Sequence, residues 1–120
     1  RVESVVKYYR NKFNVPIWIF GHSMGTVTAI QFANQGERSG AVSGLVIAGT
    51  HIGETLSNNF SKPVMAIHHQ KEACAATPIS ASEQIIKRRS KETKSELVMI
   101  DGGENVGLPC MDRPTMDLIR

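Results

Sequence analysis

The stretch from Gly21 to Gly25 reads Gly-His-Ser-Met-Gly, a Gly-x-Ser-x-Gly pattern in which Ser23 could act as a nucleophile. The pattern alone is weakly specific, because glycine and serine are common. A nucleophilic serine of this type lies on a sharp turn between a buried strand and a helix. Both glycines would then leave room where a side chain would clash. The alternative is an ordinary serine N-cap, which needs neither glycine.

The residues on either side of Ser23 predict this strand-turn-helix context. Residues 15–20 form a continuous apolar run with a proline near its start, which is typical of a strand buried on both faces. Residues 24–35 predict a helix, with Gly36 placed to cap its end. Small residues on one stripe of this helix would let it approach a sheet closely, and these are Gly25, Ala29 and Ala33. We therefore favour the nucleophile over the plain N-cap.

The rest of the chain predicts further helices and strands in alternation. Residues 2–13 have the spacing of an amphipathic helix, and a capping-box spacing predicts a helix that begins with Ser80 as its N-cap. Apolar runs predict three more strands, at 43–50, 62–69 and 95–100. This order is typical of an α/β fold with a predominantly parallel sheet flanked by helices. Catalytic groups then belong at the carboxyl ends of the strands, where the chain has Ser23, His51, His68, His69 and Asp101.

Composition narrows the classes of protein. A chain of 120 residues with 41% hydrophobic and 21% charged residues has ordinary globular composition and room for a single domain. No apolar run approaches the roughly 20 residues of a membrane span. The net charge of +3 is mild, and we interpret the basic segment 87–94 as a solvated helix end rather than a nucleic-acid site. The oligomeric state is left open.

The arrangement resembles the second half of an α/β-hydrolase, from the helix before the nucleophile to the last strand. In that superfamily the acid of the catalytic triad lies in the loop after the strand two beyond the nucleophile. The resemblance therefore implies Glu72 as the acid, where aspartate is more usual. Residues that match a subset of the superfamily, in order, are His68, His69, Glu72, Cys74, Thr77, Pro78, Gly102, Gly103 and Cys110. We expect residues 1–120 to be one partial α/β-hydrolase domain, without the upstream strands and the oxyanion loop.

The resemblance implies a serine hydrolase that acts on a small ester, thioester or amide through an acyl-enzyme at Ser23. The backbone N–H of Met24 would be one oxyanion donor. We expect no cofactor and no metal, since the ligands for a zinc site near His68 and His69 are too few. The triad histidine normally follows the acid, yet all four histidines precede Glu72, so the base is unidentified. The chain also begins without methionine, and we expect these 120 residues alone not to be a competent hydrolase.

Two other functions are consistent with the same residues. One is a non-catalytic α/β-hydrolase-like binding or scaffold protein that kept the turn and lost a triad member. A weaker one is a helix N-terminus that binds phosphate, although the pattern lacks a Walker lysine. The resemblance also implies a disulfide between Cys74 and Cys110, and hence a periplasmic or secreted protein. Two buried thiols in a cytoplasmic protein are the alternative.

Overall fold

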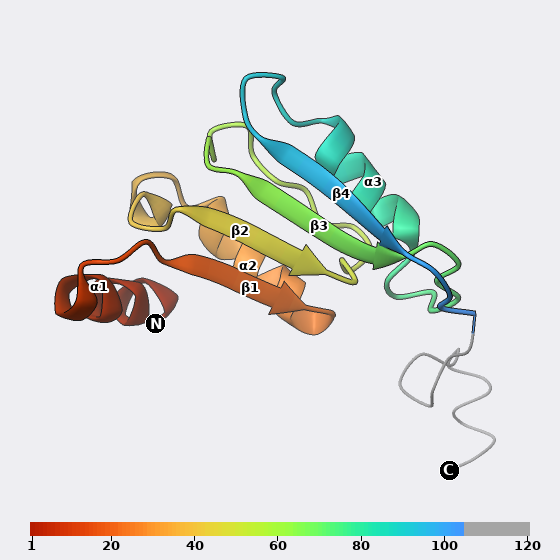
Figure 1. Ribbon diagram of the computed structural model, residues 1–120, viewed down its shortest axis with the longest axis horizontal. Helices are drawn as coiled ribbons and strands as arrows, with labels where there is room; N and C mark the ends of the chain where they lie inside the picture. Colours follow the sequence, from red (N-terminus) through yellow and green to blue (C-terminus); the bar gives the residue numbers. More distant parts are fainter. Residues whose placement is uncertain (105–120) are drawn as a thin grey trace, which may run out of the picture.

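Four parallel strands form a single sheet in the order β1-β2-β3-β4 in the computed structural model, which describes residues 1–104 (Figure 1). The strands are β1 Trp18–His22, β2 Gly44–Ala48, β3 Val64–His69 and β4 Ser95–Ile100. The helices are α1 Val2–Phe13, α2 Met24–Ala33, the 3-10 helix η1 Gly36–Ser39, and α3 Ile79–Lys87. The predicted order of helices and strands and the parallel sheet are therefore confirmed. Within the described residues, no helix has the length and apolar character needed to cross a bilayer.

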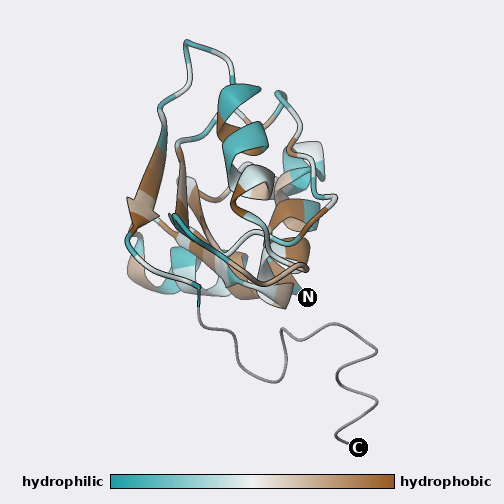
Figure 2. Cartoon of the chain, turned by 90° about the vertical axis from the view of Figure 1, so that its right-hand side faces the viewer, coloured by the Kyte–Doolittle hydropathy of each residue, from teal (hydrophilic) through white to brown (hydrophobic). Residues whose placement is uncertain are grey.

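Helix α2 packs against β1 and β2, and α3 against β3 and β4, so both lie on the same face of the sheet (Figure 1). Buried residues between these layers include Ala29, Ile30, Ala33, Leu45, Ile47, Val64, Ala66 and Ile85. Ala29 and Ala33 confirm two members of the predicted stripe of small residues, whereas the third, Gly25, is exposed. Figure 2 shows hydrophobic colours along β4 and hydrophilic colours on the loop that precedes it.

Strand β1 is less buried than its apolar sequence predicts. Trp18 is 48% exposed and Phe20 65% exposed, whereas Ile19 is half-buried and Gly21 is buried. In the described part of the chain β1 pairs only with β2, and the helices cover only one face of the sheet. The alternate residues Trp18 and Phe20 point to the other face. The prediction of a strand buried on both faces is therefore wrong for β1.

Two helix ends also differ from the sequence-based expectation. Helix α2 ends at Ala33, and Gly36 is not its cap but starts η1 with a φ of 66°. Helix α3 begins one residue before Ser80, with Pro78 as its N-cap and no capping hydrogen bond from a side chain. The predicted capping box is therefore wrong. The hydroxyl of Ser82, two residues after Ser80, faces the protein interior.

The basic segment after α3 is not wholly solvated, because Arg89 is only 8% exposed. Its guanidinium donates to the backbone oxygens of Ser57, Phe60 and Lys62 at 3.3, 2.5 and 3.0 Å. Its Nε donates to Ser95 Oγ at 3.4 Å. Burial lowers the pKa of Arg89 below its ordinary value by disfavouring the charged form. Arg89 thus joins the loop before β3 to the start of β4.

Candidate active site

Ser23 lies on a sharp turn between the carboxyl end of β1 and the first residue of α2. Its backbone has φ 54° and ψ −117°, which is a strained conformation for a residue with a side chain. The Ser23 N–H donates to Ala48 O at 2.9 Å. The Ser23 carbonyl accepts from the N–H and the hydroxyl of Thr26, at 3.0 and 2.6 Å. These bonds hold the backbone of the turn on both sides of the strained residue.

Ser23 occupies the N-cap position of α2, yet its side chain makes no capping hydrogen bond. An ordinary serine N-cap would accept a hydrogen bond from the second or third N–H of the helix. The geometry therefore differs from the plain N-cap that the sequence left open. The N–H of Met24 follows directly in the first helical turn, where backbone N–H groups have no partner within the helix.

The two glycines of the pattern are not equivalent. A Cβ at Gly21 would lie 2.5 Å from Gly25 O and 2.9 Å from the Cβ of Ala29, so only glycine fits there. A Cβ at Gly25 would meet no atom within 4 Å. The expectation that a side chain at Gly25 would clash is therefore wrong. It is the backbone of Gly25, and not its missing side chain, that Gly21 contacts.

A hollow of about 620 Å³ lies at the carboxyl ends of the strands, and we call it the strand-end hollow. Its lining includes Ser23, His69 and Glu72. The structure thus brings the predicted nucleophile and the predicted acid to the same hollow. Glu54, in the segment between β2 and β3, lines a different hollow with Gln84 and Arg88.

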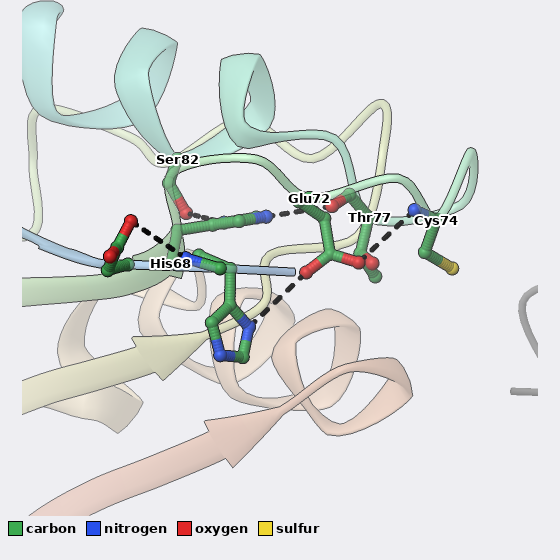
Figure 3. Close-up of polar contacts among 8 residues, drawn as sticks. His68, Glu72, Cys74, Thr77 and Ser82 are labelled. Atoms are coloured by element: carbon green, nitrogen blue, oxygen red, sulfur yellow. Dashed lines mark hydrogen bonds and ion pairs between the residues drawn. The ribbon is translucent and has the colours of Figure 1, made fainter. Parts of the chain in front are cut away.

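The side chain of Glu72 is 14% exposed and is held by two contacts (Figure 3). Its Oε1 accepts from the N–H of Cys74 at 3.2 Å, and its Oε2 lies 3.6 Å from His69 Nδ1. The loop after β4 packs directly on this region. A Cβ at Gly103, which has φ 99°, would lie 2.5 Å from the Cβ of His69 and 3.1 Å from Glu72 N. Gly103 therefore lets the two loops lie in contact.

The four histidines have different surroundings. His22 is exposed and His69 is half-exposed, and both line the strand-end hollow. His51 does not line it, and its Nδ1 is 3.1 Å from Ile52 O. His68 also borders the hollow but is only 2% exposed, with both ring nitrogens in hydrogen bonds. His68 and His69 point to opposite faces because side chains alternate along a strand.

Residues 1–104 contain no group of three or more His, Cys, Asp or Glu side chains that could hold a metal ion. Cys74 is buried in the loop after β3. Cys110 lies outside the described residues, so the predicted disulfide between Cys74 and Cys110 stays a prediction.

No protein-family model and no curated protein matches the chain, but solved structures do. A monoacylglycerol lipase of Paleococcus ferrophilus has a TM-score of 0.61 at 13% identity, over 84% of this chain and 64% of that one. A soluble variant of monoglyceride lipase from Saccharomyces cerevisiae, solved with a substrate analogue, has a TM-score of 0.64 at 15% identity, over 98% and 64%.

An α/β serine hydrolase homologue from Coxiella burnetii has a TM-score of 0.61 at 15% identity, over 84% of this chain and 47% of that chain. The chain thus spans 64% of the length of the two lipases and 47% of the length of the third protein. At these identities the likeness concerns the fold. The chain has part of the α/β-hydrolase fold, a four-stranded parallel sheet flanked by helices.

Proposed function

We propose that the protein is a serine hydrolase that acts on a small ester, thioester or amide through an acyl-enzyme at Ser23. The observation that carries the proposal is the conformation of Ser23, with φ 54° at the end of a strand and no capping bond from its side chain. A strained serine of this kind leaves its hydroxyl available at the strand-end hollow. The lipases and the hydrolase homologue with similar folds support the same chemistry.

In this mechanism Ser23 Oγ attacks the substrate carbonyl and its proton passes to a histidine base. The negative charge that forms on the carbonyl oxygen would be met by the N–H of Met24, strengthened by its place at the N-terminus of α2. Glu72 would orient the base and stabilise its protonated form. The leaving group takes the proton, and water then releases the acyl group from Ser23.

The base is the part of the triad that we leave unassigned. Among the described histidines, His69 contacts Glu72, but it precedes the acid, whereas the fold's usual order is Ser, acid, His. We therefore propose that these 120 residues do not complete the triad by themselves. Purified as this chain, the protein is expected to hydrolyse an activated ester no faster than its Ser23→Ala variant. Turnover that depends on both Ser23 and His69 would contradict this proposal and identify His69 as the base.

A fluorophosphonate probe tests the nucleophile itself, because it reacts with a serine that a base activates. The probe is applied to the natural protein that carries this chain, and mass spectrometry locates the label. We expect one label on Ser23, absent from Ser23→Ala and retained in a matched control, Ser80→Ala, which changes an exposed serine. A natural protein that folds and takes no label would favour the non-catalytic binding protein.

A further inference from the structure

Buried polar side chains join the turn at Ser23 to the loop that carries Glu72. Seven polar or charged residues are buried in residues 1–104, and five of them lie along one path. These five, which we call the buried polar path, are Thr26 in α2, Thr50 after β2, His68 in β3, Thr77 before α3, and Ser82 in α3. Their exposed fractions are all between 0% and 6%.

The first part of the path connects the turn to the end of β2. The hydroxyl of Thr26 donates to Ser23 O at 2.6 Å and accepts from the N–H of His51 at 3.0 Å. Both the donor and an acceptor site of this hydroxyl are therefore used. Since His51 is bonded covalently to Thr50, the chain after β2 is tied to the strained residue.

The second part connects Thr50 to the loop after β3, and Figure 3 shows its contacts among Ser82, His68 and Thr77. Thr50 Oγ1 lies 2.7 Å from Ser82 Oγ, and Ser82 Oγ lies 2.8 Å from His68 Nδ1. His68 Nε2 lies 2.7 Å from Thr77 O. The ring of His68 therefore joins Ser82 in α3 to Thr77, which lies at the end of the loop between β3 and α3.

The carbonyl at the end of the path fixes the direction of one hydrogen bond, and the others follow from the tautomer of His68. A carbonyl oxygen only accepts, so His68 Nε2 must carry a hydrogen and donate to Thr77 O. In a neutral imidazole that carries its hydrogen on Nε2, the other nitrogen, Nδ1, accepts. Ser82 then donates to His68, and Thr50 donates to Ser82. All described buried side-chain polar atoms have partners.

We propose that the buried polar path is a positioning device that fixes the loop of Glu72 relative to Ser23. This inference rests on the proposed function, because it assigns the acid role to Glu72. The loop leaves β3 beside His68 and enters α3 just after Thr77, so one imidazole holds both of its ends. Glu72 lies between these ends, and its carboxylate is bonded within the same loop. Apolar side chains could fill the same space, but they would not fix the loop through directional bonds.

The test uses Thr50→Val in the natural protein that carries this chain, with Thr50→Ser as the variant that keeps the hydroxyl. Thr50 does not bond to His68, yet its loss removes the donor to Ser82. We expect Thr50→Val to shift the ring-nitrogen resonances of His68 and to increase hydrogen exchange of amides 71–77. We also expect kcat to fall about 10- to 100-fold, with KM nearly unchanged, as small misplacements of catalytic groups do. Thr50→Ser keeps the hydroxyl, so its His68 resonances, amide exchange and kcat are expected to stay close to those of the natural protein.

Matched controls are Thr28→Val, which changes an exposed residue of α2, and Ser80→Ala, which changes an exposed residue of α3. Neither is expected to move the His68 resonances or kcat. The proposal is overturned if Thr50→Val leaves the His68 resonances and amide exchange unchanged, or if it changes them and kcat stays the same. If the natural protein shows no turnover that depends on Ser23, the proposed function fails. The resonances and amide exchange still decide whether the path holds the loop.

Discussion

The non-equivalence of Gly21 and Gly25 gives a sharp prediction, since the pattern Gly-x-Ser-x-Gly treats them alike. A Cβ at Gly21 would meet Gly25 O at 2.5 Å, and this contact is with backbone, which cannot rotate away. Overpacking of this kind destabilises by about 1–3 kcal/mol. A Cβ at Gly25 would meet open space, and replacing a helical glycine by alanine stabilises by about 0.4–1 kcal/mol. Gly21→Ala and Gly25→Ala should therefore differ by roughly 1.5–4 kcal/mol in the free energy of unfolding.

The assay is denaturant unfolding of the natural protein and of both variants, followed by a spectroscopic probe of the fold. For a domain of about 100 residues, each kcal/mol corresponds to a change of about 4–8 °C in Tm, so thermal melts should order the three proteins clearly. Gly25→Ala is the matched control for Gly21→Ala, because it adds the same methyl group on the other side of Ser23. Equal stabilities of the two variants would refute the packing of α2 against β1 as described.

Three further predictions follow from the described contacts and the resemblance. Glu72→Gln should lower turnover by orders of magnitude, with the melting temperature nearly unchanged, as loss of a triad acid does. Arg89→Ala should destabilise the fold by about 2–4 kcal/mol in denaturant unfolding, because three buried or partly buried backbone oxygens lose their donor. Peptide mapping of the natural protein without reductant should recover Cys74 and Cys110 as one linked pair.

Each of these predictions has an outcome that contradicts it. Glu83→Gln and Arg88→Ala change exposed residues on or beside α3 and should be neutral in turnover and stability respectively. If Glu72→Gln is as active as Glu83→Gln, another residue is the acid. If Arg89→Ala unfolds no earlier than Arg88→Ala, the buried bonds of Arg89 do not stabilise the fold. If Cys74 and Cys110 are instead recovered as two separately alkylated thiols, the prediction of a disulfide is wrong. The argument for a periplasmic or secreted protein then fails with it.

The sequence was sufficient to predict the order of helices and strands, because the strands of a parallel sheet are continuous apolar runs. It also located the turn at Ser23, since the glycine-serine pattern and its flanking elements are local features. The exposure of Trp18 and Phe20 was not predictable from their own apolar character. It depends on which strands and helices lie beside β1, and a local pattern holds no information about neighbours distant in the chain.

Residues whose roles depend on tertiary contacts were not predictable for the same reason. Ser82 follows the predicted N-cap Ser80 and was given no role, but its hydroxyl bonds to Thr50 after β2 and to His68 in β3. Arg89 belonged to a basic run and was interpreted as solvated, although backbone oxygens from a distant loop surround it. The sequence analysis treated His68 and His69 alike and did not predict which of them is buried. Strand alternation would have separated them once the end of β3 was known.

The strain at Ser23 is itself an argument about function. A non-glycine residue in such a conformation costs on the order of 1–3 kcal/mol, and the fold does not need it to start a helix, since an ordinary N-cap conformation would do so. Here the capping bond is absent, while the backbone of Ser23 is held by Ala48 and Thr26. What the conformation provides is a hydroxyl at the strand-end hollow that is not committed to the helix. The strained conformation lowers stability and is not needed to start the helix. A nucleophile on a sharp turn requires such a conformation, and this favours catalysis over a simple structural role for Ser23.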